Sequence, residues 1–202
     1  MDLEAIIKAP TRDADWIKKC LLIGLIALIP IAGILNLLGW MKDIYRRVKA
    51  GDTTLPDASL NYIGSGWSMF LAVLPIAIFP IFIGMLGAGL AVAHLFRLLP
   101  LLQIINLPVR LFLNLVFVPT LIYRHVVHGT GFGGAFDFAG IKRTWMANPT
   151  QFLTFAVMYF CASLIGGLGV IACCVGMFVT LPFSVAIHAN VIKSFEDVSD
   201  GV

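Results

Sequence analysis

The sequence predicts an all-α fold, a polytopic transmembrane helical bundle with about six membrane-inserted segments. Three observations predict it. Hydrophobic residues make up 59% of the 202 residues and the mean hydropathy is +0.95, well above the roughly 45–50% apolar content of a soluble domain. Charged residues make up only 12% of the chain. The 14 Lys and Arg residues stand mostly in clusters between long uncharged runs, as in short loops between membrane-inserted helices.

The first uncharged run, residues 20–41, predicts a hairpin. Two lysines precede this run and four basic residues follow it closely. A single spanning helix would place one of these clusters on the outer side of the membrane, against the bias of Lys and Arg toward the cytoplasm. We therefore expect two short helices that turn at residues 30–33, between Pro30 and Gly33, although the length also allows one kinked span.

Four more segments follow along the chain. Residues 66–96 form the third segment, which is longer than a bilayer requires and should kink at Pro75 and Pro80. Arg97 ends it, a proline-bearing linker over residues 98–109 leads to Arg110, and residues 111–123 form the fourth segment. The fifth and sixth segments cover residues 150–165 and 176–191, and glycines in 166–169 with the segment 173–176 predict the turn between them.

Each hairpin follows a short amphipathic segment that should lie in the membrane interface as an elbow helix. These segments cover residues 3–15, 57–66 and 134–148. The last one mixes Phe136, Phe138, Ile141 and Trp145 with basic residues, a composition that favours the interface plane. We therefore expect a single integral membrane domain over residues 1–202, with hairpin units of approximately 1–50, 51–128 and 129–195 and a tail of 196–202.

The charges predict how this domain is oriented. Twelve of the 14 Lys and Arg residues lie on the side of both termini, and only Arg97 and Arg110 lie on the other side. Because short loops rich in Lys and Arg stay on the cytoplasmic side of the membrane, we expect a multi-pass protein with cytoplasmic N- and C-termini. The net charge of +3 is too small to indicate binding to nucleic acid, and the basic residues are scattered over short loops.

Two groups of motifs carry a resemblance to a known family. One is the acidic-Trp-basic entry of residues 13–19 with Leu-Ile-Pro-Ile-Ala-Gly at residues 28–33. The other is Phe-Gly-Gly-Ala-Phe-Asp-Phe at residues 132–138, followed by Asn148-Pro149, a Gly-rich span and Leu-Pro-Phe at residues 181–183. In these residues the chain resembles the prokaryotic membrane-protein family catalogued as domain of unknown function 4013. The resemblance implies this topology in the prokaryotic cytoplasmic (inner) membrane, and it implies no particular activity.

Candidate site residues fall into three groups. Basic residues near the membrane surface are candidate contacts for lipid headgroups, and small residues spaced four apart are candidates for close helix packing. Uncharged polar residues within the spans could line a pore. The headgroup candidates are Lys142, Arg143, Arg97 and Arg110, the packing candidates are Gly84, Gly87, Ala88 and Ala91, and the pore candidates are Asn36, Asn114 and Thr180.

Other chemistry has little support in the sequence. We expect no Asp, Glu, Lys or Arg in the middle of a span, which argues against proton relays and ion-coupled transport. The four cysteines lack the spacing of a metal site, and neither a catalytic motif nor a cofactor is indicated. His125, His128 and His188 could together hold a metal, but histidines at an interface are more often amphipathic anchors. His94 beside Arg97 could contact a lipid phosphate.

These observations favour a non-enzymatic membrane protein, a scaffold or subunit of a membrane assembly that contacts lipids. Its partners would be membrane lipids and other membrane proteins in a homo- or hetero-oligomer. The first alternative is an uncharged-pore channel or facilitator, which requires the polar span residues to meet on one aqueous path. The second alternative is a membrane enzyme without a recognisable catalytic motif, which requires the histidines and Asp137 to meet in one pocket.

Overall fold

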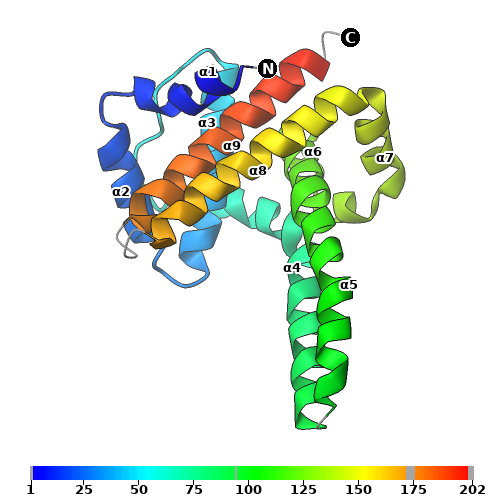
Figure 1. Cartoon of the computed structure of the whole chain (residues 1–202). Helices are drawn as coiled ribbons and strands as arrows, with labels where there is room; N and C mark the ends of the chain where they lie inside the picture. Colours follow the sequence, from blue (N-terminus) through cyan, green and yellow to red (C-terminus); the bar gives the residue numbers. More distant parts are fainter. Residues whose placement is uncertain (1, 94, 172–175, 200–202) are drawn as a thin grey trace.

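The computed structural model of the chain describes residues 2–93, 95–171 and 176–199. Within these ranges the regular structure is helical and contains no strand, which confirms the predicted all-α class. Both termini lie at one end of the molecule, where most of the helices pack together. A long hairpin of α4 (Ile63–Val92) and α5 (Leu99–Phe112) projects from this body (Figure 1).

The first predicted hairpin is present as two helices with a turn between them. A short helix α1 (Leu3–Lys8) and a 3-10 turn η1 (Ala9–Arg12) lead to α2 (Trp16–Ile26) and α3 (Ala32–Lys49). The turn requires unusual backbone: Ile31 has φ +63°, and a Cβ on Gly33 would lie 2.6 Å from backbone atoms of Ala27. Glycine is therefore the residue that fits where α3 begins.

The expectation of six spanning segments is not confirmed. The helix α2 has 11 residues, about 16 Å, against a hydrocarbon core of about 30 Å. The second half of α3 is rich in charge. By length and composition, three helical stretches in the described ranges could cross a membrane, or up to four if the bent α4 is one span. The three are Phe96–His128, Pro149–Gly169 and Met177–Ser199.

Helix α4 (Ile63–Val92) bends as its prolines predict. Its two parts, Ile63–Ile76 and Ile81–Val92, meet at 41°. The break follows Pro75 closely, and a proline removes a backbone hydrogen bond and crowds the preceding turn. The second part of α4 lies against α5, where Gly87 faces Leu102 and Leu99.

The predicted linker over residues 98–109 is wrong, because this stretch is helical. A 3-10 turn η2 (Phe96–Leu98), α5 (Leu99–Phe112), a π-helical segment η3 (Leu113–Phe117) and α6 (Val118–His128) run on as one stretch of 33 residues. Pro100 stands in the first turn of α5, where no helical N–H is needed. Pro108 lies inside the helix, a position that membrane helices tolerate. The span predicted at residues 111–123 therefore starts too late.

The third unit contains a 3-10 segment η4 (Phe132–Phe136), α7 (Phe138–Ala147), α8 (Pro149–Ile171) and α9 (Met177–Ser199). The predicted elbow over residues 134–148 is thus largely helical, and the last two helices are longer than expected. The elbow helix predicted over residues 57–66 is wrong, because residues 57–62 are not helical and α4 begins at Ile63. Residues 173–175 of the predicted turn between them lie outside the described residues. Helix α9 packs against α8, α2 and α3 and so forms the centre of the body (Figure 1).

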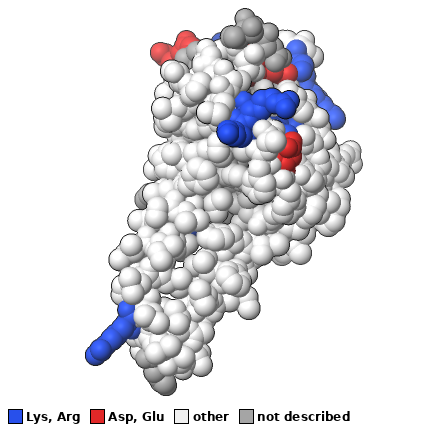
Figure 2. All heavy atoms as spheres, turned by 90° about the vertical axis from the view of Figure 1, so that its right-hand side faces the viewer, with Lys and Arg blue, Asp and Glu red and all other residues white. Residues whose placement is uncertain are grey.

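The buried core lies in this body and not in the projecting hairpin. Trp40, Phe155 and Ile192 are among its fully buried side chains. On the hairpin, by contrast, Val92 and Ile104 are 81% and 68% exposed. Figure 2 shows basic atoms near both ends of the molecule and a wide uncharged surface between them. Large hydrophobic side chains are exposed on this part of the molecule, which is unfavourable in water and suits the hydrocarbon region of a membrane.

Candidate functional site

Arg110 lies in the middle of the longest apolar helix. On a continuous helix it stands about 20 Å along the axis from both Arg97 and Arg124. The expectation that no span carries a charge in its middle is therefore wrong for this helix, and the cause is the misassigned linker. In a helix that crosses a membrane, an ionisable side chain midway along its length is expensive and usually functional.

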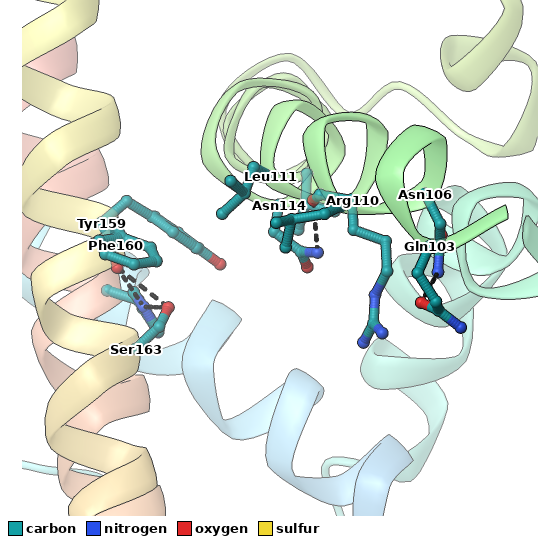
Figure 3. A pocket seen from close by; sticks show the side chains of 11 residues that line it. Gln103, Asn106, Arg110, Leu111, Asn114, Tyr159, Phe160 and Ser163 are labelled. Carbon is teal, nitrogen blue, oxygen red and sulfur yellow. Dashed lines mark hydrogen bonds between the residues drawn. The ribbon is translucent and has the colours of Figure 1, made fainter. Parts of the chain in front are cut away.

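A cavity of about 520 Å³ opens beside this arginine, between the long helix, α8 and α9 (Figure 3). We call it the α5–α8 groove. Amide side chains and one guanidinium come from the long helix, and a hydroxyl, an imidazole and two aromatic rings come from the facing helices. The groove is lined by Gln103, Asn106, Leu107, Arg110, Leu111, Asn114, Val118, Tyr159, Phe160, Ser163 and His188.

The polar residues of the long helix share a face because of their spacing. Gln103, Asn106, Arg110 and Asn114 follow one another at intervals of three, four and four residues. Residues three and four apart lie one above the other on a helix, so these side chains form a polar stripe on an otherwise apolar segment. This spacing is the signal that could have identified Gln103 and Asn106, had residues 98–109 been assigned to a helix.

Two polar groups of the stripe lack a partner among the described residues. The Arg110 guanidinium makes no hydrogen bond or ion pair there, and Figure 3 shows it extending away from the amides. Asn106 is only 7% exposed, and its Oδ1 accepts no hydrogen bond. Its Nδ2 donates a long bond of 3.5 Å to Gln103 Oε1. A buried acceptor left unpaired costs about 1–3 kcal/mol, so the groove offers unused hydrogen-bonding capacity.

The opposite wall is held by its own hydrogen bonds. The rings of His188 and Tyr159 stack with centroids 3.9 Å apart. His188 Nε2 lies 3.0 Å from Tyr159 O and 3.1 Å from Ser163 Oγ, and the Ser163 hydroxyl donates to Tyr159 O at 3.0 Å. Because these groups bind one another and the backbone, they form a fixed wall rather than a reactive set.

The helix backbone is irregular next to Arg110. The π-helical segment η3 begins three residues after it, and Asn114 Nδ2 donates to Arg110 O at 2.8 Å. π-Helical turns occur often at functional sites, since they rotate side chains out of the regular helical pattern. A second cavity of about 230 Å³, toward α4 and α6, is also lined by Arg110 and Asn114. Arg110 thus stands between two cavities.

The three pore candidates are not brought to one cavity among the described residues. Asn114 lines the α5–α8 groove. Asn36 is fully buried in α3, with neither side-chain amide atom hydrogen-bonded. Thr180 in α9 donates to Gly166 O at 3.2 Å. The pore alternative stays a prediction, and this arrangement gives it no support.

The remaining candidates have diverse surroundings. Arg97 is exposed near the tip of the projecting hairpin, and Lys142 and Arg143 are exposed on α7. Gly84 and Ala88 are exposed on α4, whereas Gly87 faces α5. Ala91 is half-buried, and His94 lies outside the described residues.

The closest helix approaches use glycines that the sequence did not single out. A Cβ on Gly24 would collide with the backbone of Phe178, so α2 touches α9 there. Cβ atoms on Gly39 and Gly66 would collide with backbone oxygens across the contact of α3 with α4. These positions, unlike Gly84, require glycine for backbones to meet.

The histidines have separate partners and do not form one site. His125 Nδ1 bonds to Thr130 O and its Nε2 lies 3.2 Å from Ser68 Oγ. His128 meets the Tyr123 ring edge to face, and His188 belongs to the groove. Asp137 pairs with Arg124 at 2.5 Å, away from the groove. Among the described residues no three His, Cys, Asp or Glu side chains are placed to hold a metal.

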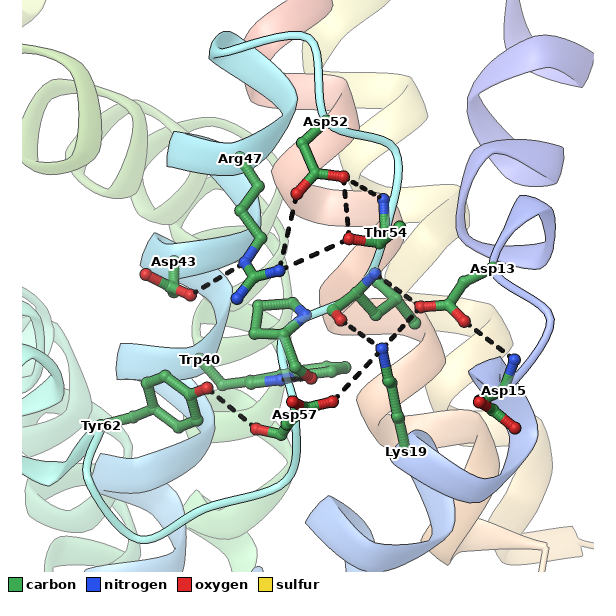
Figure 4. A network of polar contacts seen from close by, with 12 residues as sticks. Asp13, Asp15, Lys19, Trp40, Asp43, Arg47, Asp52, Thr54, Asp57 and Tyr62 are labelled. Carbon is green, nitrogen blue, oxygen red and sulfur yellow. Dashed lines mark hydrogen bonds and ion pairs between the residues drawn. The ribbon is translucent and has the colours of Figure 1, made fainter.

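A polar network at the end with the termini was not predicted (Figure 4). The buried Asp13 carboxylate accepts from Lys19 Nζ at 2.9 Å, from Asp15 N and from Leu55 N, each at 2.8 Å. Lys19 Nζ also donates to Leu55 O at 2.7 Å. Burial by itself would raise the pKa of Asp13, but the hydrogen bonds from Lys19 and the two backbone amides outweigh it and leave this pKa lowered. The network fastens the loop between α3 and α4 to the start of α2.

Further ion pairs use basic residues that the sequence assigned to topology alone. Lys49 pairs with the buried Glu196 at 2.6 Å, joining α3 to α9, and Tyr45 donates to the same carboxylate at 2.7 Å. Arg47 pairs with Asp43 and Asp52. A lysine or arginine at the inner end of a helix therefore also forms ion pairs that hold neighbouring segments together.

Comparison with known proteins identifies a family for most of the chain. No curated protein and no solved structure matches the chain. A family match covers residues 22–175, more than half of the chain and all of the α5–α8 groove up to Ser163. Over these residues the chain belongs to the family described as "Protein of unknown function (DUF4013)".

Proposed function

We propose that this protein is a non-enzymatic integral membrane protein that binds the anionic headgroup of a membrane lipid in the α5–α8 groove, as a subunit or scaffold of a membrane assembly. The observation that carries the proposal is Arg110, an unpaired cation in the middle of a 33-residue apolar helix. The proposal includes an orientation in the prokaryotic cytoplasmic membrane with both termini in the cytoplasm.

Charge and hydrogen bonding favour an anionic ligand. A cation near the bilayer centre costs about 2.5–3.5 kcal/mol on insertion scales, so a counter-charge would offset part of that cost. No residue that lines the groove is acidic. The unpaired Arg110 guanidinium offers its N–H donors to an anionic group, whereas Asn106 Oδ1 is buried and out of reach of a ligand.

The mouth of the groove suits an amphiphile rather than a free ion. Leu107 and Leu111 are 62% and 51% exposed beside the polar stripe, and Phe160 is 36% exposed on the facing helix. These side chains would meet acyl chains while Arg110 meets the headgroup. The groove is open toward the lipid-facing surface, so a lipid could enter sideways.

A second copy of this chain could not neutralise Arg110 within the membrane. The helices Ile63–Val92, Phe96–His128 and Pro149–Ile171 contain no Asp or Glu. The two acids of α9, Glu196 and Asp197, lie at its end and pair with Lys49 and Lys193. A lipid or a different membrane protein is therefore the better counter-charge, and the groove's apolar mouth favours lipid.

The test is retention of anionic lipid by purified variants. Native mass spectrometry of protein extracted from bilayers with phosphatidylglycerol should show about fivefold less bound lipid for Arg110→Ala, equivalent to about 1 kcal/mol. Arg110→Lys should retain an intermediate amount. Arg97→Ala is the matched control, since it removes the same charge from the same helix outside the groove. Equal losses for Arg97→Ala and Arg110→Ala would contradict the proposal.

A further inference from the structure

A third cavity, separate from the α5–α8 groove, lies where α6, α7 and α9 meet. Its volume is about 340 Å³. We call it the α7 pocket. Its lining combines basic, amide and hydroxyl side chains with an aromatic floor, and it comprises Tyr123, His128, Arg143, Thr144, Ala147, Asn148, Phe195 and Ser199.

From this lining we infer that the α7 pocket binds a phosphate group, carried by the headgroup of an anionic lipid. The inference does not depend on the proposed function, because the pocket shares no residue with the α5–α8 groove. It also assigns different roles to the two adjacent basic residues of α7, because Arg143 lines the pocket and Lys142 does not.

The pocket offers donors and positive charge without a carboxylate. Arg143 forms no ion pair among the described residues. Asn148 Oδ1 accepts from Gln151 N at 3.3 Å, which leaves the Nδ2 amide to donate toward the pocket. His128 touches the Tyr123 ring with its edge, and no described side chain binds its ring nitrogens. A guanidinium with nearby N–H donors matches the oxygens of a phosphate.

Nearby acids are engaged elsewhere. On α9, Glu196 pairs with Lys49 and Asp197 pairs with Lys193, so neither faces Arg143. Asp137, at the start of α7, pairs with Arg124. Asp137 also attracts Arg143 electrostatically without forming an ion pair with it, so among the described residues no carboxylate is paired with Arg143, and an anion would supply that partner.

The floor of the pocket is rigid. Phe195 is 3% exposed and its ring lies 4.9 Å from that of Tyr123, edge to face. Phe155 stacks on Phe195 with centroids 4.5 Å apart. Tyr123 Oη lies 3.2 Å from Ser199 Oγ, which joins α6 to the end of α9. A ligand would meet a preformed surface, which lowers the entropic cost of binding.

The surroundings favour a lipid over a soluble phosphate as the source. Phe138 and Met146 on the same helix are each 65% exposed, next to the exposed Lys142 and Arg143. Helices that mix exposed apolar and basic side chains lie in the membrane interface, where headgroup phosphates are concentrated. Figure 2 views the side on which α7 lies and shows basic side chains gathered above a wide uncharged surface.

The experiment compares Arg143→Ala with Lys142→Ala in the full-length protein. Both changes remove one exposed positive charge from α7, and only the first alters the pocket. Two probes are used: phosphatidylglycerol retained from bilayers, counted by native mass spectrometry, and inorganic phosphate titrated into protein in phosphatidylcholine nanodiscs. Thermal unfolding of both variants confirms that each is folded.

We expect Arg143→Ala to retain at least fivefold less phosphatidylglycerol than the wild type, and Lys142→Ala to change retention less than twofold. Saturable binding of inorganic phosphate that Arg143→Ala alone abolishes would support the same site with a soluble source. Two results would overturn the inference: equal losses for both variants, which indicate general attraction to an anionic surface, or no loss for Arg143→Ala with either probe. Arg110→Ala should leave the Arg143-dependent binding unchanged, so failure of the groove proposal is distinguishable.

Discussion

Gly66 shows how a single missing methyl group sets the packing of two helices. A Cβ there would collide with the carbonyl oxygen of Leu35, because α4 crosses α3 backbone to backbone. We expect Gly66→Ala to push the helices apart and lower stability by about 1–3 kcal/mol. Gly64→Ala, one half-turn away on the same helix, meets open space and should be neutral or slightly stabilising. The measurement is the thermal midpoint in detergent, and equal shifts for the two variants would refute the argument.

Asp13 predicts a pH dependence with a definite sign. Its pKa is lowered in the folded protein by hydrogen bonds that outweigh burial, so its contribution to stability is present above the unfolded value of about 3.9 and is lost as pH falls through the lowered value. Asp13→Asn should therefore cost about 2 kcal/mol at pH 7. The difference from wild type should shrink below about pH 4, where the carboxylate of the unfolded chain begins to protonate, and it should vanish once the folded carboxylate protonates as well.

Unfolding curves recorded between about pH 3 and about pH 7 in the same detergent measure the difference in stability between the wild type and Asp13→Asn. Asp57→Asn is the control, because Asp57 is 91% exposed although it also pairs with Lys19. If Asp13→Asn is less stable than the wild type by the same amount at every pH, the lowered pKa of the Asp13 carboxyl is not the source of the difference.

Prediction at the level of residues succeeds where a feature depends on neighbours in the sequence, and it fails where the feature depends on residues far apart in the chain. The turn between Pro30 and Gly33 follows from neighbouring residues and was predicted. The Asp13 network joins positions up to 42 apart in the chain, and no sequence spacing indicates such a pairing. Arg110 was recognised as a candidate, but at the outer surface, because its depth depends on whether residues 98–109 are helical.

At the scale of elements, α7 depends on one residue at its start. Asp137 Oδ1 accepts from Gly140 N at 2.9 Å as a cap, and its Oδ2 pairs with the buried Arg124. Removing both interactions in Asp137→Ala should release the segment 129–137. The loss of the cap costs about 0.5–2 kcal/mol, and Arg124 loses its carboxylate partner while it keeps its bond to the backbone oxygen of residue 137. We expect faster chymotrypsin cleavage at Phe132 and Phe136, both exposed.

Asp137→Asn separates the two roles of this side chain. The amide oxygen can still cap α7, whereas the charge that faces Arg124 is lost. If the cap dominates, Asp137→Asn should be cleaved nearly as slowly as wild type, and if the ion pair dominates it should resemble Asp137→Ala. Cleavage of Asp137→Ala at the wild-type rate would contradict any role of Asp137 in holding α7.

The predicted elements failed where prolines were treated as breaks. Apolar runs and glycine turns located α2, α3, α8 and α9 to within several residues, because hydrophobicity and turn residues act locally. Pro100 and Pro108 indicated a linker, yet Pro100 needs no N–H in a first turn and Pro108 is accommodated within the helix. A proline ends a helix in water more reliably than in an apolar surrounding, where an unwound backbone would leave several polar groups unsatisfied.

At the scale of the whole molecule, polar connections and apolar exposure are segregated. The ion pairs of Lys19, Lys49 and Arg124 lie in the body near the termini, whereas the hairpin of α4 and α5 is largely exposed and apolar. Arg97 lies near the tip of the hairpin, and Arg110 is a charge partway along it. Proximity to lipid on most sides makes this hairpin the part of the chain that the membrane itself must stabilise.

The same segregation gives a topology test centred on the helix Phe96–His128. With 33 residues this helix is about 50 Å long and exceeds a hydrocarbon core of about 30 Å, so its two ends should reach opposite surfaces. In single-cysteine variants, Arg97→Cys should react with a membrane-impermeant maleimide from the side opposite to Gly51→Cys and Thr130→Cys. Ile105→Cys should stay unreactive from both sides, since this residue is 65% exposed and would face acyl chains about 12 Å along the helix from Arg97. Ready labelling of Ile105→Cys from the Arg97 side would restore an aqueous linker between Arg97 and Arg110, and it would remove the intramembrane position on which the binding role of Arg110 depends.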